Sequence, residues 1–290
     1  MVHKIAICFL ITKNIINPEV WQKWWSGNED KINIYVHYSK GMESKVTLPF
    51  LVNNRVPPVP TKWGDISLVN AECQLYTEAY KKTSNKFFIL VSDTCIPIRS
   101  FTYVYKRLMR NLDKGIAPFR AIDKWSVKYS SPDEFQPFIP SESCINKMKL
   151  RSMIGKTLYA IDQWKILSRK NVKDFRDMMK NKTFVRIFTS CIEIVPDSLA
   201  PDELMFANYL RYKYSDNLGK HLRYGLVTFV DFVGKAIHPV NYKNLTVTVA
   251  GNVCFNNAMF ARKFIKHNPK IAKKIPVKCY KRYVKNFGKK

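Results

Sequence analysis

The stretch "FFILVSDTCIP", residues 87–97, decides the fold of this 290-residue chain. Five apolar residues, Phe87 to Val91, run directly into a polar segment that contains Asp93, and Pro97 then ends the pattern. A short apolar run with such boundaries predicts a strand that is buried on both faces. Ligands of open α/β sheets bind just beyond the carboxyl ends of such strands. Asp93 therefore has three interpretations: a metal ligand, a contact to an organic ligand, or a residue that shapes a turn.

Strands and helices alternate on both sides of this stretch. Apolar runs at 4–11 and 32–37 predict two further strands. Residues 65–83 place apolar side chains at helical spacing, and a second helix is expected at about 100–113. This alternation predicts an α/β fold with a mostly parallel central sheet flanked by helices.

The second half of the chain is expected to continue the alternation. Three segments have helical patterns: 162–179, 200–214 and 255–265. Three others have strand patterns: 155–161, 225–232 and 244–251. The polar, aperiodic segment 121–150 is expected to be a long surface loop, which often carries function. Without an internal repeat or a Gly/Ser-rich linker, the whole chain is expected to form one domain.

The chain is strongly basic, with 49 Lys and Arg against 22 Asp and Glu and a formal net charge of +27. Such a charge implies polyanionic partners: nucleic acid, an anionic membrane surface or phosphorylated small molecules. A solvated basic face is an equally good interpretation. Nucleic acid is not expected, because no zinc-finger, RNP-like or basic-zipper pattern is present. An apolar content of 46% excludes a disordered chain.

The spacing of the cysteines and the apolar run near the N-terminus predict the cellular compartment. No CxxC pair occurs among the seven cysteines, which are Cys8, Cys73, Cys95, Cys144, Cys191, Cys254 and Cys279. Reduced thiols are therefore expected, without a zinc site or a disulfide framework. The apolar run near the N-terminus is too short for a signal peptide and lacks a cleavage site. No run approaches the ~20 residues of a membrane span. We expect a cytoplasmic protein, soluble or peripherally attached to a membrane.

Familiar catalytic motifs are missing from the sequence. There is no GxGxxG, GxxxxGK[ST], HExxH or GxSxG pattern. No Asp-x-Asp, Asp-x-Glu or Glu-x-Asp pair occurs either. A divalent ion that faces a diphosphate usually needs one or two carboxylates. Asp93 has no acidic neighbour, so a metal site is not expected.

A longer block, residues 61–109, contains a W-G-x-x-S-L pattern, the apolar strand and then S-D-T-C-I-P. This block resembles the core-2/I-branching β-1,6-N-acetylglucosaminyltransferase family, and its plant-type branch most of all. Further similar segments follow in order along the chain: "IYVHYSK" at 34–40, "GKTLYAI" at 155–161, "PDE" at 201–203, "VTFVDF" with His238-Pro239, and "AGN…MFARKF" at 250–264.

The resemblance implies a fold of the GT-A type and inverting transfer of a sugar from a UDP-sugar to a hydroxyl of a glycan acceptor, without a metal cofactor. N-acetylglucosamine is the expected sugar, and xylose is the alternative. Residues 1–120 are then the nucleotide-sugar-binding half, 121–264 the acceptor and catalytic half, and 265–290 a basic tail. That tail is a candidate contact to an anionic membrane surface.

Glu203 is the expected general base, because the family's catalytic glutamate lies in the matching Pro-Asp-Glu. An inverting displacement needs a carboxylate that takes the proton of the attacking hydroxyl. The alternative is structural, since Pro201, Asp202 and Glu203 suit the first turn of a helix, where acidic residues favour the macrodipole.

Cations are expected to stabilise the diphosphate leaving group in place of a metal. The family uses an Arg and a Lys near the C-terminus. Lys263 matches the Lys, whereas Lys243 stands where the family has Arg, so that the bidentate fork is lost. Arg262 is the alternative candidate for the role of the family's Arg. Solvation alone explains most other lysines of so basic a chain.

The resemblance assigns further contacts. Tyr38 and Ser39 fall where the family contacts uridine, although Tyr38 suits the core equally well. Trp63 and Gly64 are expected in the wall of the donor pocket. A separate group is expected to contact the sugar or the acceptor: Ser92, Asp93 and Asp231. The resemblance places Asp93 where metal-dependent relatives keep their aspartate motif and favours a role in ordering the loop.

One alternative from another functional class remains open. A non-catalytic polyanion- or membrane-binding protein with a degenerate transferase fold explains the charge. Eukaryotic relatives carry a membrane anchor and structural disulfides, so their expected absence indicates a bacterial or virus-encoded enzyme.

Overall fold

The computed structural model describes residues 2–122, 149–150, 152–155, 157–191, 200–215, 217–232 and 238–279. Its centre is a six-stranded sheet in the order β2 (Ile32–Tyr38), β1 (Lys4–Ile11), β3 (Asn85–Val91), β8 (Ile166–Ser168), β5 (Gly115–Ala117) and β9 (Leu222–Tyr224). Neighbouring strands are parallel, except that β8 is antiparallel to both of its neighbours. The predicted α/β class with a mostly parallel sheet is confirmed, and the arrangement is consistent with the GT-A type.

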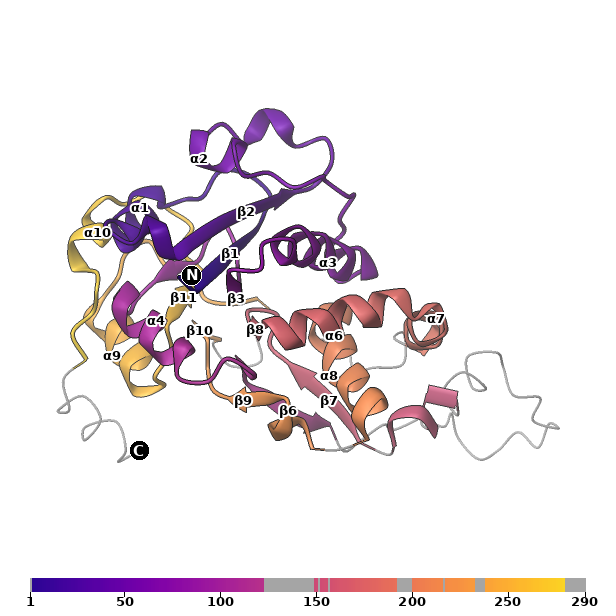
Figure 1. Cartoon of the computed structure of the whole chain (residues 1–290). Helices are drawn as coiled ribbons and strands as arrows, with labels where there is room; N and C mark the ends of the chain where they lie inside the picture. The colour runs from indigo at the N-terminus through magenta and orange to yellow at the C-terminus, as the bar shows by residue number, and fades with distance from the viewer. Residues whose placement is uncertain are drawn as a thin grey trace, which may run out of the picture.

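Helices cover both faces of this sheet (Figure 1). One group packs together beside the sheet: α3 (Ile66–Tyr80), α6 (Arg169–Lys180), α7 (Lys182–Cys191) and α8 (Pro201–Tyr214). On the other side lie α1 (Pro18–Trp25) and α4 (Phe101–Met109). Short connecting elements are η1 (Glu29–Lys31), η2 (Glu43–Lys45), α2 (Pro49–Val52) and η4 (Leu218–Lys220).

Two small sheets complete the described fold. One has the order β10 (Thr228–Val230), β11 (Phe260–Arg262) and β4 (Ile96–Pro97). It packs with α9 (Val247–Phe255) and α10 (Lys270–Lys274) around a second hydrophobic cluster. The other is the antiparallel pair β6 (Phe119–Ile122) and β7 (Leu158–Ile161).

The sequence located the first half of the fold well. The three strands predicted at 4–11, 32–37 and 87–91 appear as β1, β2 and β3. Every residue from Phe87 to Val91 is fully buried, as expected for a strand covered on both faces. The helices predicted at 65–83 and 100–113 are α3 and α4, and that predicted at 200–214 is α8.

Two predictions near the C-terminus were wrong. Residues 244–251 were expected to form a strand, but α9 begins at Val247, and the Thr246 side chain caps it by accepting from the N–H of Val249. Residues 255–265 were expected to form a helix, but β11 lies there, between β10 and β4. The helix cap at Thr246 overrides the local pattern in the first case, and pairing with strands distant in sequence does so in the second.

The segment 162–179 was predicted as wholly helical, which is wrong for its first part. Strand β8 occupies Ile166–Ser168, and α6 begins only at Arg169. Ser168 and Asn171 form a capping box that fixes this start. Three residues of strand are too few to show periodicity. The partners that make them a strand, β3 and β5, lie elsewhere in the chain.

The prediction of reduced thiols was wrong for one pair. Cys254 and Cys279 form a disulfide, with their Cα atoms 5.4 Å apart across 25 residues of sequence. The bond links α9 to the segment that follows α10. Whether two cysteines lie close enough to bond depends on the tertiary fold, which their spacing in the sequence does not reveal. Among the other described cysteines, Cys8, Cys73 and Cys95 are free.

Two expected segments lie largely or partly outside the described residues: the surface loop at 121–150, apart from its ends, and the basic tail from 280 onward. In the part of the chain that is described, no helix is both long and apolar enough for a membrane span.

Candidate active site

A pocket of about 690 Å³ opens where the small sheets meet the first turn of α8. This volume is typical of a small-molecule site. The lining includes the loop before α3 (Trp63, Gly64), the strands β6 and β7, the segment that follows β7 (Asp162, Gln163, Trp164), the start of α8 (Asp202, Glu203), and β11 with its next residue (Arg262, Lys263).

Glu203 lies in the first turn of α8, and its side chain faces this pocket. Pro201 occupies the first helical position, where its missing N–H costs nothing. The residue before it, Ala200, has no side chain to cap the helix. Glu203 therefore does not form a capping box, which needs a Ser or Thr side chain at the position of Ala200.

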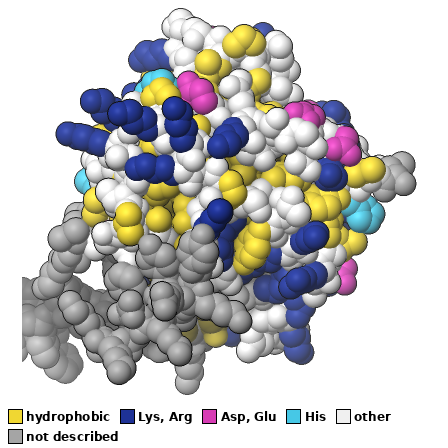
Figure 2. Space-filling view, turned by 90° about the vertical axis from the view of Figure 1, so that its left-hand side faces the viewer, with side chains coloured by type: hydrophobic (Ala, Val, Ile, Leu, Met, Phe, Trp, Pro, Cys, Tyr) yellow, Lys and Arg dark blue, Asp and Glu magenta, His cyan; other side chains and the backbone are white. Residues whose placement is uncertain are grey.

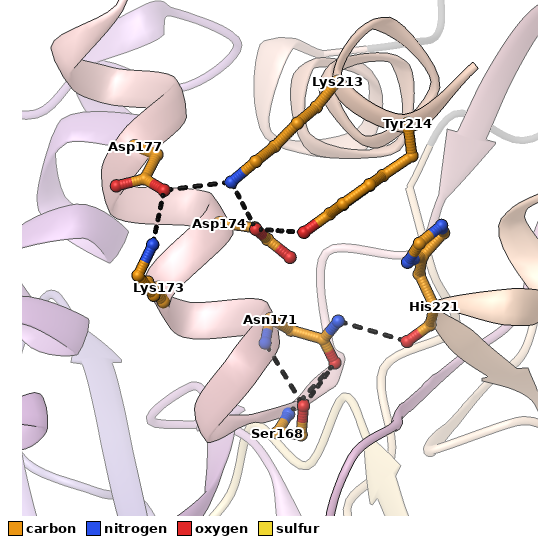
Figure 3. Close-up of polar contacts among 8 residues, drawn as sticks. All are labelled: Ser168, Asn171, Lys173, Asp174, Asp177, Lys213, Tyr214 and His221. Carbon is orange, nitrogen blue, oxygen red and sulfur yellow. Dashed lines mark hydrogen bonds and ion pairs between the residues drawn. The ribbon is translucent and has the colours of Figure 1, made fainter. Parts of the chain in front are cut away.

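The far end of α8 is anchored to α6 (Figure 3). Lys213 forms ion pairs with Asp174 at 2.7 Å and with Asp177 at 3.0 Å. The Tyr214 hydroxyl donates to Asp174 at 2.8 Å. These contacts join the C-terminal end of α8 to α6, at the end of the helix opposite Glu203.

The environment of Glu203 makes it a better base. Burial raises its pKa to about 7, and the nearby Asp202 and Asp162 carboxylates add to this effect. Arg120 and Lys165 oppose the rise. A carboxyl that titrates near neutral pH is matched to proton abstraction from a hydroxyl.

Two cations from β11 and its following residue share the pocket with Glu203. The Arg262 guanidinium lies over the Trp164 ring, 4.6 Å from its centroid. Its Nε atom is buried without a hydrogen-bond partner among the described residues. The adjacent Lys263 also lines the pocket. An anion would satisfy these donors, because stacking on one face leaves the guanidinium edge free.

Trp63 and Gly64 line the pocket, as expected for its wall. Gly64 has φ of +73°, and a Cβ atom there would meet nothing within 4 Å. Its backbone conformation, rather than a close approach, therefore favours glycine. Trp63 is 77% exposed, and its ring lies 6.2 Å from that of His238.

Aromatic side chains form a rim around the pocket. Besides Trp63, Tyr224 is 72% exposed and Phe232 is 51% exposed, and both line the pocket. Phe119 packs edge-on against Tyr224 with ring centroids 5.5 Å apart. Exposed aromatic surface gathered at a cleft indicates a ligand-binding face.

Asp93, the residue at the end of β3, orders a turn. Its Oδ2 atom accepts a hydrogen bond of 2.9 Å from the Thr12 hydroxyl, at the end of β1. Its carbonyl oxygen accepts from the N–H of Ile16 at 3.0 Å. The neighbouring Ser92 bonds with Thr94 and Cys95. Neither Asp93 nor Ser92 lines the pocket described above.

The structure does not bring four other expected site residues into the pocket lining. Tyr38 is buried in the main core, and Ser39 accepts a hydrogen bond from the N–H of Thr61. Lys243 is exposed on a loop beside the segment that follows β11. Asp231 accepts a 2.7 Å hydrogen bond from the Tyr242 hydroxyl, one residue before Lys243.

Several pocket residues were not assigned to the site from the sequence: Arg120, Asp162, Trp164, Asp202 and His238. The sequence did contain a signal for Asp162, because this residue directly follows the predicted strand at 155–161, just as Asp93 lies shortly after β3. Burial raises the pKa of Asp162 to about 6. Arg120 lies on β6 opposite Ala160 of β7, and no local sequence pattern predicts this strand pairing.

Among the described residues, no group of three or more His, Cys, Asp or Glu side chains is arranged to hold a metal ion. The pocket carboxylates, Asp162, Asp202 and Glu203, have two cations near them: Arg120, which also lines the pocket, and Lys165, which is fully buried behind it.

Comparison with known proteins gives three findings. The model of the Core-2/I-Branching enzyme family matches residues 5–256. Glycosyltransferase BC10 of Oryza sativa subsp. japonica is 26% identical over 175 residues, which are 59% of this chain and 39% of the rice protein. A solved structure of 4-diphosphocytidyl-2C-methyl-D-erythritolsynthase from Anaerococcus prevotii DSM 20548 shares 12% identity, with a TM-score of 0.28 over 62% of this chain and 77% of that one. Since the family model matches most of its length, this chain belongs to the Core-2/I-Branching enzyme family.

Proposed function

We propose that this protein is an inverting glycosyltransferase that moves a sugar from a UDP-sugar to a hydroxyl group of a glycan. One observation carries the proposal: a carboxylate with a raised pKa, Glu203, shares a pocket with two cations, Arg262 and Lys263. The family membership and the glycosyltransferase relative support the same reaction class.

In this mechanism Glu203 takes the proton of the acceptor hydroxyl while that oxygen attacks the anomeric carbon from the face opposite the nucleotide. The bond from this carbon to the diphosphate oxygen breaks, and UDP leaves with the electron pair. Negative charge grows on the diphosphate as the bond breaks. In the proposed mechanism Arg262 and Lys263 stabilise this charge, since preorganised cations act most strongly where charge develops.

The donor we propose is UDP-N-acetylglucosamine, with UDP-xylose as the alternative. The support is the resemblance of residues 61–109 to the family, together with the position of Trp63 and Gly64 in the pocket wall. The aromatic rim of Trp63, Tyr224 and Phe232 is the proposed platform for a sugar ring, whose apolar face packs well on exposed aromatic surface.

We further propose that transfer needs no metal ion. The Asp93 carboxylate is bound to Thr12, and two cations already face the pocket, so the charge of the leaving group has partners on the protein. Excess chelator should leave the rate unchanged. Loss of transfer with chelator, and its recovery with Mn²⁺ or Mg²⁺, would contradict this mechanism.

A screen of UDP-sugars tests the reaction class. Release of UDP from each donor is measured with water or added oligosaccharides as acceptors, and donor binding is measured by calorimetry. Turnover of UDP-N-acetylglucosamine above that of GDP- and CMP-sugars is expected. Failure to bind any UDP-sugar or UDP would contradict the proposal and favour the non-catalytic alternative.

A second role, attachment to an anionic membrane surface, has its own support. Lys and Arg side chains are spread over the face shown in Figure 2, with few Asp or Glu. No acidic residue follows Asp231 in the sequence, and Lys266, Lys270, Lys273 and Lys274 are exposed. Co-sedimentation with phosphatidylserine vesicles, but not with phosphatidylcholine vesicles, is expected at low salt and should weaken as salt rises.

A further inference from the structure

A buried ion pair lies behind the wall of the pocket. Lys165 Nζ is 2.9 Å from Glu72 Oε2, and both side chains have no exposed surface. Glu72 is on α3, the helix that follows the Trp63–Gly64 wall, whereas Lys165 directly precedes β8. A buried pair of this kind is seldom favourable for stability compared with apolar residues of the same size. It therefore calls for another explanation.

The Lys165 ammonium also reaches the first turn of α8. It donates to the carbonyl oxygen of Asp202 at 3.3 Å and to that of Gln163 at 3.2 Å. Asp202 precedes Glu203, and Gln163 follows Asp162, so both contacts are to neighbours of pocket carboxylates. Lys165 thus joins α3, the segment after β7 and the start of α8 at one buried point.

On the side of Glu203 that faces Lys165, most of the neighbouring charges are negative. Asp202 and Asp162 both raise the pKa of Glu203, and the Asp202 Oδ1 atom is buried without a hydrogen-bond partner among the described residues. Glu72 lies behind them. The opposing cations are Arg120 on β6, which is exposed, and Lys165. Arg120 has the larger effect on the pKa of Glu203, whereas Lys165 is the cation that is fully buried and that also contacts the first turn of α8.

We infer that Lys165, held by Glu72, is a positioning residue that fixes the first turn of α8 and keeps Glu203 ionised among the neighbouring carboxylates. This inference rests on the proposed role of Glu203 as the base. Its consequence is that the pH at which Glu203 becomes available depends on a side chain that never touches the substrate.

The experiment replaces the pair as a unit. In Glu72→Met/Lys165→Met both charges go and the volume is nearly kept, a change that buried ion pairs often tolerate. Single replacement of Lys165 would leave Glu72 buried and unpaired, so the double variant is preferred. Lys213→Met is the matched control: it removes an α8–α6 ion pair about 15 Å along the helix from Glu203.

The titration of Glu203 is read directly from the carboxyl resonances of protein labelled with ¹³C-glutamate, without any assay of transfer. The signal that disappears in Glu203→Gln identifies the residue. Both charges of the pair are lost in the double variant, but Lys165 is the member that contacts the first turn of α8 and lowers the pKa of Glu203. Its loss is therefore expected to outweigh the loss of Glu72 and to move the midpoint up, by about one pH unit at most. It should not move in Lys213→Met. The acidic limb of donor hydrolysis is expected to shift by the same amount.

The outcomes separate this inference from the proposed function. An unchanged midpoint in the folded double variant overturns it, and so does an equal shift in Lys213→Met, because the effect would then be merely structural. If the double variant does not fold, Glu72→Gln keeps a hydrogen-bond acceptor for Lys165 and removes only the negative charge, so the midpoint should fall; no change overturns the inference. A shifted resonance without any transferase activity would leave the inference standing and contradict the proposed function.

Discussion

The backbone N–H of Phe264 donates to the carbonyl oxygen of Thr94 at 3.0 Å. Thr94 belongs to the polar stretch after β3, and Phe264 follows Lys263. Strand β4, in the same stretch, also pairs with β11. The motif that decided the fold therefore acts as a platform for the segment that carries Arg262 and Lys263, rather than as a ligand set of its own.

Asp93 should accordingly be structural. Asp93→Ala loses the hydrogen bond from Thr12 and is expected to cost about 1–2 kcal/mol of unfolding free energy. Asp93→Asn keeps an acceptor and should cost less. Both are measured by urea denaturation. Stabilisation of the parent protein by Mn²⁺, abolished in Asp93→Asn, would instead identify a metal ligand.

Lys263 should contact the phosphates of the donor. Lys263→Ala is expected to weaken UDP binding about tenfold or more while uridine binding changes little, because a charge-assisted hydrogen bond contributes about 1.5–3 kcal/mol. Lys243→Ala and Lys266→Ala should have smaller effects, since neither residue lines the pocket. Calorimetric titration of UDP and uridine measures all three. Equal losses across the set would mean that the charge acts only as a diffuse field.

Trp63 should bind sugar without supporting the fold. The side chain is 77% exposed, so Trp63→Ala is expected to leave the melting temperature nearly unchanged. Loss of a stacking surface should raise KM for the donor or the acceptor several-fold, as expected for an aromatic contact of about 1 kcal/mol. Steady-state kinetics beside a thermal melt separates the two effects. A large fall in melting temperature with unchanged KM would assign Trp63 to the core.

The sequence predicted the parts of the fold that local patterns govern. Uninterrupted apolar runs located β1 and β3, and helical spacing located α3. It failed for α9, because the Thr246 cap overrides the β-branched alternation at 244–251. It failed for β11, because strand pairing across the small sheet overrides the helical pattern at 255–265. Local propensity differences of under about 1 kcal/mol yield to such tertiary contacts.

The candidate site was partly predictable for the same reason. The resemblance named Glu203, Lys263 and Trp63, which do share a pocket. Asp162 and Lys165 were missed, because their proximity to Glu203 comes from the packing of β7, β8 and α8 rather than from any motif.

The raised pKa of Glu203 has a consequence for stability. A carboxyl whose pKa lies near 7 in the folded chain, against a usual value near 4.5, contributes stability below about pH 4.5 that is lost as pH rises through 7. Glu203→Gln removes this penalty and should unfold at higher urea than the parent protein at pH 8, with the two converging toward pH 4. A variant less stable than the parent at pH 8 would favour the helix-start role.

The central claim is that Glu203 is the general base, and the pH dependence of turnover in Glu203→Gln tests it most directly. In the parent protein, kcat/KM for UDP-sugar turnover should rise with pH about tenfold per unit and level off above about 7, because only the ionised carboxylate accepts the proton. Glu203→Gln should lose roughly a hundredfold or more in kcat and lose this limb, with UDP affinity nearly unchanged. A Gln variant that keeps more than half of the parent kcat with saturating acceptor, or the same acidic limb, would contradict the account.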